Sequence, residues 1–176
     1  MLLELQITSI RFIIRQLTVK DVSYRYLEWL QDDTVQKIIY GAAPNIKLND
    51  LKRYVSGQEK NPSVLFLGVF CKESGKHIGN IKFDPIGYEK NYTVMGILIG
   101  EKEWRGKGVA KEVITSTFFW INGKYNITKM VLGVDKSHKS AIKAYKKIGF
   151  KAKYNERKDG DADDGNTIME LSIEDL

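Results

Sequence analysis

Hydrophobic and polar positions follow two periods along this chain, one typical of strands and one of helices. Residues 10–17 (IRFIIRQL) have the apolar, β-branched composition of a strand. Apolar residues at helical spacing follow over residues 24–30, and residues 18–21 supply capping side chains for that helix. The other helices expected in this part of the chain are a short one over residues 34–39 and one from an Asn49 cap to Ser56-Gly57.

Three strand-like runs occupy the middle of the chain, over residues 63–72, 77–86 and 92–100. The turn-rich residues 73–76 join the first two runs as a hairpin. The third run extends the hairpin, so we expect an antiparallel meander of three strands.

A long amphipathic helix is predicted after the meander, over residues 109–121, with Asn122-Gly123 as its stop. Residues 129–135 form the next strand. Because a helical crossover connects them, this strand is expected to lie parallel to residues 92–100. The remaining elements are a helix capped by Ser137 and ended by Gly149, and two strands over residues 150–157 and 167–172.

This order of elements indicates an α+β protein, a sheet with helices on both faces. At 176 residues the chain is long enough to bury one sizeable core. No linker-like segment divides it, so residues 1–176 are expected to form a single domain.

The chain carries 28 lysine and arginine residues against 22 acidic residues, a formal net charge of +6. This excess suits an anionic partner, although a solvated surface rich in lysine would have the same composition. The basic residues are scattered and interrupted by acidic ones, whereas nucleic-acid binding favours a concentrated basic stripe. A compact phosphorylated cofactor therefore fits better than a nucleic acid.

Cys71 is the only cysteine, so neither an internal disulfide nor a thiolate metal cluster is expected. The first residues lack the basic and apolar regions of a secretion signal, and no run approaches transmembrane length. We therefore expect a cytoplasmic protein that binds no metal and no membrane. A monomer and a homodimer both remain open.

The stretch WRGKGVA, residues 104–110, lies between a predicted strand and the long helix and has the character of an anion-binding turn. Gly106 and Gly108 allow a ligand to approach the backbone closely. The first N–H groups of the helix would then point at the ligand with the positive end of the helix dipole. Phosphate is the natural ligand of such a turn.

Three phosphate-binding patterns compete for this turn. A Walker A loop fails because five residues separate Gly100 from Gly106, one too many, and Gly108 stands where serine or threonine is needed. A dinucleotide fingerprint would need a third glycine at Lys111. The third pattern, Arg/Gln-x-x-Gly-x-Gly/Ala, is matched by Arg105, Gly108 and Ala110. An ordinary strand-to-helix turn is the alternative to all three.

The element order, this turn and residues 134–150 (VDKSHKSAIKAYKKIGF) together resemble the GNAT superfamily of acyl-CoA-dependent N-acetyltransferases. Residues 26–32 (YLEWLQD) look like the RimJ/RimL branch, whose members acetylate protein N-termini, small amines or nucleotide-linked amino sugars. The resemblance implies a mixed, mostly antiparallel sheet with a central splay and acetyl-CoA bound in the resulting cleft. The backbone of residues 97–99 would bind the pantetheine and the turn would wrap the pyrophosphate. The residues concerned are Ile97, Leu98 and Ile99, and then Arg105, Gly106, Lys107, Gly108, Val109 and Ala110.

The resemblance also implies catalytic roles. Tyr145 stands where many family members place the general acid that protonates the CoA thiolate, although a core tyrosine is the alternative. His138 replaces an asparagine that commonly contacts the pantetheine, and a surface position is equally open. The family's catalytic glutamates would fall at Val94 and Gly133, which cannot accept a proton. Base candidates are therefore Asp84, Glu101 and Glu28, each of which could instead be a surface charge.

The acceptor pocket is expected at the early helices, lined by Tyr24, Tyr26, Trp29 and residues 40–45, which include Tyr40. A core position is the alternative for Trp29, as it is for Leu30. The resemblance implies direct transfer of an acetyl group to a primary amine, such as a protein N-terminus, an amino sugar or another small amine. The missing glutamates leave a non-catalytic acyl-CoA sensor as an alternative. A basic nucleic-acid-binding module is a third.

Overall fold

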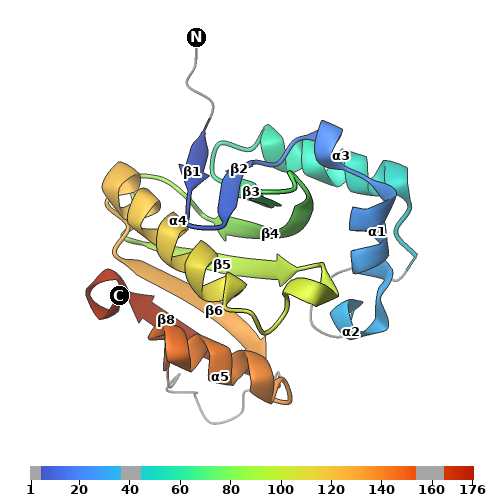
Figure 1. The fold of residues 1–176 in the computed structure, drawn as a ribbon. Coiled ribbons are helices and arrows are strands. Elements are labelled where there is room, and N and C mark those ends of the chain that lie inside the picture. The colour runs from blue at the N-terminus through green and yellow to red at the C-terminus, as the bar shows by residue number, and fades with distance from the viewer. Residues whose placement is uncertain (1–4, 37–44, 154–164) are drawn as a thin grey trace.

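The computed structural model describes residues 5–36, 45–153 and 165–176. The strands form one sheet in the order β1-β2-β3-β4-β5-β6-β8-β7 (Figure 1). In chain order they are β1 Gln6–Thr8, β2 Phe12–Gln16, β3 Leu65–Cys71, β4 His77–Asp84, β5 Tyr92–Ile99, β6 Lys129–Asp135, β7 Lys151–Ala152 and β8 Asn166–Ser172.

Helices cover both faces of this sheet. The long helix α4 and helix α5 pack on one face, where α4 crosses in front of the strands in Figure 1. Helices α1 and α3 pack on the other face. The helix bounds are α1 Tyr24–Gln31, α2 Asp33–Gln36, α3 Leu48–Glu59, α4 Val109–Tyr125 and α5 Lys139–Ile148.

The predicted meander is confirmed, because β3, β4 and β5 pair in sequence and antiparallel. The parallel relation of β5 and β6 is confirmed as well. These two strands pair only between residues 92–94 and 129–131, and no ladder joins the remainder of the two strands. Toward their carboxyl ends they draw apart, as Figure 1 shows. The expected splay is therefore present at the centre of the sheet.

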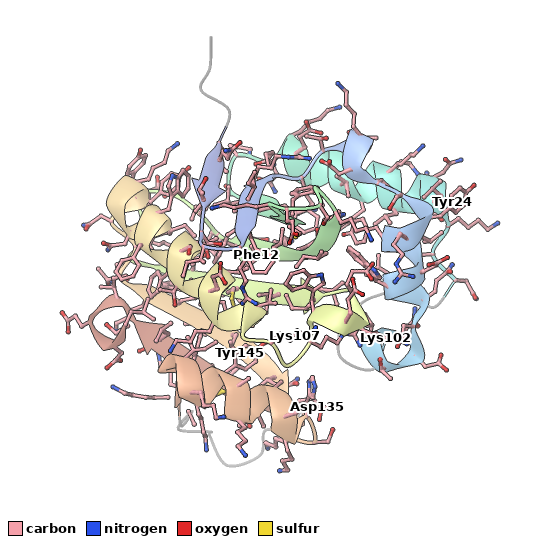
Figure 2. The ribbon with its side chains drawn as sticks, viewed as in Figure 1. Phe12, Tyr24, Lys102, Lys107, Asp135 and Tyr145 are labelled. Carbon is pink, nitrogen blue, oxygen red and sulfur yellow. The ribbon has the colours of Figure 1, made fainter. Side chains whose placement is uncertain are left out.

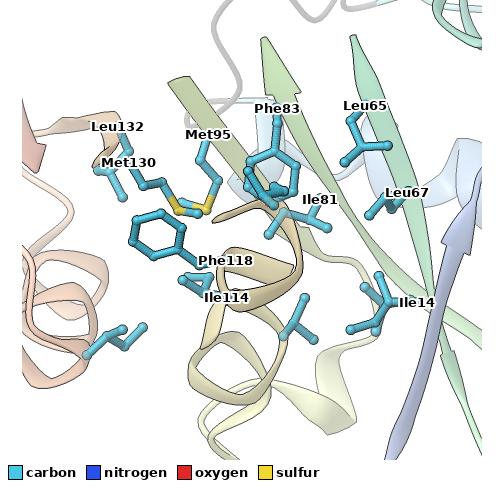
Figure 3. Close-up of a cluster of buried hydrophobic side chains, with 14 of the residues drawn as sticks. Ile14, Leu65, Leu67, Ile81, Phe83, Met95, Ile114, Phe118, Met130 and Leu132 are labelled. Carbon is cyan, nitrogen blue, oxygen red and sulfur yellow. The ribbon is translucent and has the colours of Figure 1, made fainter. Parts of the chain in front are cut away.

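The larger hydrophobic core lies between the sheet and α4. One stripe of that helix, which includes Ile114 and Phe118, packs on β4, β5 and β6 through residues such as Ile81, Met95 and Leu132 (Figure 3). These side chains are buried. Their spacing along α4 explains why the helix forms there, since isolated helices are marginal without such packing. This core holds α4, and with it the preceding turn, against the sheet.

A second core lies on the opposite face, beneath α1 and α3. It is rich in aromatic residues and is built from Tyr26, Trp29, Leu51, Phe66 and Phe70, among others. This core fixes the early helices over β3 and β4. Among the described residues no helix is long and apolar enough to span a membrane.

Several predicted boundaries are wrong near the N terminus. Ile10 lies in an exposed turn, so the strand begins at Phe12 instead. Thr18 and Asp21 form the capping box of a separate 3-10 turn, Val19–Asp21. Helix α1 is capped by Ser23, whose hydroxyl oxygen accepts a hydrogen bond from the Tyr26 amide at 3.1 Å. The sequence holds two capping signals close together, Thr18 and Ser23, and the pattern alone did not show that each caps a different helical segment.

Later helix ends also differ from the prediction. Asn49 and Gly57 lie inside α3, whose N-cap position is Lys47. Asn122-Gly123 does not stop α4, because the buried stripe carries the helix on to Tyr125, and Asn126 ends it with φ 56°. His138, not Ser137, holds the N-cap position of α5. The predicted ends at 39 and 157 lie outside the described residues.

Candidate active site

The turn before α4 has the geometry of an anion-binding site. Gly106 and Gly108 have φ of 73° and 74°, in the left-handed region that glycine adopts without strain. Helix α4 begins directly after them, and no described side chain caps its first turn. The first helical amides therefore keep their N–H groups for a ligand. A Cβ on Gly106 would meet no atom within 4 Å, so a pyrophosphate can approach this backbone.

The turn is braced by two arginines. The Arg105 guanidinium donates hydrogen bonds to the carbonyl oxygens of Ile99 and Gly100, each at 2.9 Å, and so ties the turn to the end of β5. Arg11 donates from Nη2 to the Lys107 carbonyl at 3.1 Å. Both side chains thus shape the turn by hydrogen bonds to its backbone.

Arg11 is held in turn by Glu112 in the first turn of α4. The Glu112 carboxylate accepts from the Arg11 amide at 2.6 Å, from Arg11 Nε at 2.7 Å and from the Ser9 hydroxyl at 2.7 Å. Burial opposes ionisation of Glu112, but these hydrogen bonds outweigh it and lower the pKa of the carboxyl. The sequence reading missed this brace, because Arg11 and Glu112 are far apart in the chain.

A cavity of about 710 Å³ runs from the splay to the space beneath α1 and α3. Its outer part lies between the diverging strands and α5. The residues there are Ile97, Ile99, Arg105, Leu132, Gly133, Val134, Asp135, His138 and Tyr145. Its inner part, called here the inner chamber, is lined by Tyr26, Leu30, Thr34, Val35, Ile46, Leu51, Tyr54, Phe66, Asn80, Lys82, Met95, Gly96 and Leu98.

Tyr145 lies on α5 and lines the outer part of the cavity (Figure 2). Its ring packs edge-on against Phe150, with centroids 5.5 Å apart. Burial raises the pKa of the Tyr145 phenol, so the group stays protonated at neutral pH. A protonated phenol beside the cleft can act as a general acid.

His138 also lines the cavity, from the N-cap position of α5. Its backbone amide donates to the Asp135 carbonyl at 2.9 Å. Its Nδ1 atom is buried and has no hydrogen-bond partner in the described part of the chain. An unpaired buried nitrogen at this position is available to a ligand in the cleft.

The carboxylates expected as bases are engaged elsewhere. Both oxygens of Glu101 accept hydrogen bonds from Arg25 at 2.6 Å, and Oε1 also accepts from the Trp29 indole at 3.0 Å. The Arg25 hydrogen bonds lower the pKa of Glu101. Asp84 is exposed and lies 3.5 Å from the Lys82 ammonium, and Glu28 pairs with Arg25 on the surface. None of these three carboxylates lines the cavity.

The residues expected to line the acceptor pocket lie at different places in the structure. Tyr26 lines the inner chamber. Trp29 does not; it is buried against the end of β5, because its ring packs on Gly100. Tyr24 is 72% exposed and lines a separate groove with residues 45–49. Tyr40 lies outside the described residues.

Two polar residues of the inner chamber escaped the sequence reading. Asn80 and Lys82 alternate along β4 and face the α1–α3 side of the sheet. The alternation of polar and apolar residues along β4 was visible in the sequence. Which face of the sheet the polar residues occupy, and what covers it, depends on where α1 and α3 pack. Among the described residues, no group of three or more histidine, cysteine or acidic side chains could hold a metal ion.

A family model described as an acetyltransferase (GNAT) domain matches residues 11–151. The match spans the braced turn, both sides of the splay and α5. The chain has no significant match among curated protein sequences.

Solved structures share the fold at low sequence identity. A RimL ribosomal L7/L12 α-N-protein acetyltransferase in complex with coenzyme A aligns with a TM-score of 0.80 and 12% identity, covering 98% of this chain and 100% of the other. A spermidine N-acetyltransferase from Vibrio cholerae, in complex with CoA and spermine, aligns with a TM-score of 0.77 and 16% identity over 94% and 97%. A GNAT-family acetyltransferase from Bacillus anthracis aligns with a TM-score of 0.78 and 16% identity, covering 97% of this chain and 99% of the other.

Proposed function

The chain belongs to the GNAT acetyltransferase family and is an acetyl-CoA-dependent N-acetyltransferase. On that premise we propose that it transfers the acetyl group directly to a primary amine inside the cavity described above. The donor supplies an activated thioester. Residues 1–176 act as one domain in this proposal. The observation that carries it is the cavity itself, which joins the splay to the inner chamber.

The donor would enter along the outer part of the cavity. Its pyrophosphate accepts hydrogen bonds from the free amides at the start of α4, with Gly106 and Gly108 leaving the backbone open. At the end of β5, Ile97, Leu98 and Ile99 pair with β4 but have no ladder to β6, so the side of the strand that faces the splay can offer backbone groups to the pantetheine. The unpaired Nδ1 of His138 lies on the opposite wall and supplies a further contact.

Tyr145 would hold the proton that the departing thiolate needs. Its phenol lies beside the splay and is kept protonated by burial. Since Glu101, Asp84 and Glu28 all lie away from the cavity, the chain offers no carboxylate base among them. Asp135 does line the cavity, but hydrogen bonds from Ser137 lower the pKa of its carboxyl, which makes it a weak base. In this proposal the acceptor amine loses its proton to water, and most of the catalysis comes from positioning the two substrates.

Acetyl-CoA binding and CoA release test the proposal. Isothermal titration is expected to show one acetyl-CoA site, and the variant Gly108→Ala is expected to weaken it because alanine is strained at φ 74°. Gly57→Ala is the matched control, since its Cβ would meet no atom within 4 Å. Absence of acetyl-CoA binding would overturn the proposal.

The competing function is a non-catalytic acyl-CoA sensor. Such a protein would bind acetyl-CoA and release no CoA with any amine in a thiol assay. Turnover that depends on an amine would exclude it.

A further inference from the structure

Lys82 stands in the middle of the inner chamber wall. It lies on β4 between Phe66 of β3 and Gly96 of β5, its two cross-strand partners. A Cβ on Gly96 would meet no atom within 4 Å, so the neighbouring strand leaves open space on that side of the lysine. The Lys82 side chain is 28% exposed and lines the cavity. Its ammonium can therefore reach a molecule bound there.

The ionised side chain that lines the described part of the inner chamber is positive. Lys82 is the one ionised side chain among the described residues that line it, and no described carboxylate does so. Asp84 pairs with Lys82 at 3.5 Å, but its side chain is 51% exposed, and such pairs are weak in water. A cationic ligand would thus meet repulsion here.

Asn80 adds a second donor beside Lys82. It is only 4% exposed, and its Oδ1 accepts a hydrogen bond from His77 Nε2 at 2.8 Å. The Gly79 carbonyl, 3.0 Å from the same nitrogen, can only accept, so Nε2 carries the proton. This contact orients the amide, and no described hydrogen bond uses its nitrogen. The chamber wall therefore presents an ammonium and an amide N–H₂ side by side.

On these grounds, and resting on the proposed function, we infer that the acceptor amine carries an anionic group, a carboxylate or a phosphate, that Lys82 and Asn80 hold in the inner chamber. Both donors match such a group, and hydrogen bonds to charged partners are stronger than neutral ones. Polyamines are excluded as favoured acceptors, because they would place several cations against Lys82.

Matched pairs of acceptors test this inference by the kcat/KM for CoA release. Glucosamine 6-phosphate is compared with glucosamine, and leucine with leucinamide, so that phosphate and carboxylate are tested separately. Spermidine is the cationic member. At least one anionic acceptor is expected to exceed its uncharged partner by about tenfold or more, and spermidine should be the poorest.

Variants of Lys82 assign the preference to this residue. Lys82→Met is expected to remove the advantage of the anionic acceptor, with a much larger loss of kcat/KM for anionic than for uncharged acceptors. Lys82→Arg should retain the advantage of the anionic acceptor. Asp84→Asn should increase that advantage, because it removes the carboxylate that pairs with the Lys82 ammonium. Lys60→Met, at an exposed position after α3, removes the same charge elsewhere and should change nothing.

Three results would overturn the inference while acetyl-CoA binding still supports the proposed function. These are equal or better rates with uncharged or polycationic acceptors, no transfer to any anionic acceptor, and an equal loss for all acceptors in Lys82→Met. Absence of acetyl-CoA binding would instead reject the proposed function.

Discussion

The indole Nε1 of Trp29 donates a hydrogen bond to Glu101 Oε1 at 3.0 Å, which fastens α1 to the chain just beyond β5. The same indole ring packs on Gly100, where a Cβ would lie only 2.0 Å from Trp29 Cδ2. A residue expected to contact the acceptor therefore positions the strand end that leads into the donor turn. This contact links the helices over the inner chamber to the turn that we propose binds the pyrophosphate.

Gly100→Ala is expected to destabilise the protein by about 1–3 kcal/mol, because the new methyl group overlaps the buried Trp29 ring. Acetyl-CoA affinity should fall as well, since Arg105 is bonded to the Gly100 carbonyl. Urea denaturation and titration measure the two effects. The control Gly123→Ala lies inside α4 with no atom within 4 Å of its Cβ, and it should stabilise the protein by about 0.5–1 kcal/mol. Equal stability of Gly100→Ala and wild type would contradict the packing argument.

Glu101→Gln separates a structural role from a catalytic one. We expect kcat within about threefold of wild type, because Glu101 is bound by Arg25 and Trp29 and lies outside the cavity. Since the Arg25 hydrogen bonds lower its folded pKa, Glu101 stabilises the protein above its ordinary pKa. That contribution is lost as pH falls through the folded value. The variant should thus lose part of the acid dependence of the melting temperature. A collapse of kcat, with loss of the acidic limb of the rate profile, would restore Glu101 as the base.

Tyr145→Phe should lower kcat by about 10²-fold with little change in acetyl-CoA affinity, because only the proton donor is removed. Burial raises the pKa of Tyr145, so the alkaline loss of wild-type rate should lie above the ordinary phenol value of about 10. Rates of CoA release against pH measure this. Tyr125→Phe, in the remote aromatic cluster with Trp120, is the control and should keep the wild-type rate. A wild-type rate in Tyr145→Phe would remove Tyr145 from the mechanism.

His77 should make the fold sensitive to mild acid. Burial lowers the pKa of its imidazole, which packs against Phe70, Tyr26 and Trp29. The unfolded chain therefore takes up the proton first as pH falls below about 6.5. Stability is full above that pH and is lost toward the folded value, by at most about 1.4 kcal/mol per pH unit.

Melting temperatures between pH 8 and pH 5 check this expectation. His77→Gln should flatten the dependence in that range, whereas His138→Gln, the matched control, should retain it. A wild-type melting temperature that stays constant over this range would show that protonation of His77 does not destabilise the fold, and would contradict this expectation.

The regular elements were predictable because their signals are local. The apolar runs of β3, β4 and β5 and the apolar stripe of α4 are local signals of burial, and the parallel placement of β6 follows from its crossover. Helix ends were less predictable. Asn49 and Gly123 have capping chemistry, but packing carries α3 and α4 through them.

The two halves of the site differ for a physical reason. The residues proposed to bind the donor are nearly contiguous, from Ile97 through the turn to Ala110. Their pattern, together with the order of elements and residues 134–150, was therefore enough to indicate the family that the family model shows. The acceptor side is assembled from α1, α3, β3 and β4, whose side chains meet only after two cores have formed. Tertiary structure alone therefore decided that Trp29 and Glu101 fasten α1 to the chain just beyond β5, and that Asn80 and Lys82 face the chamber.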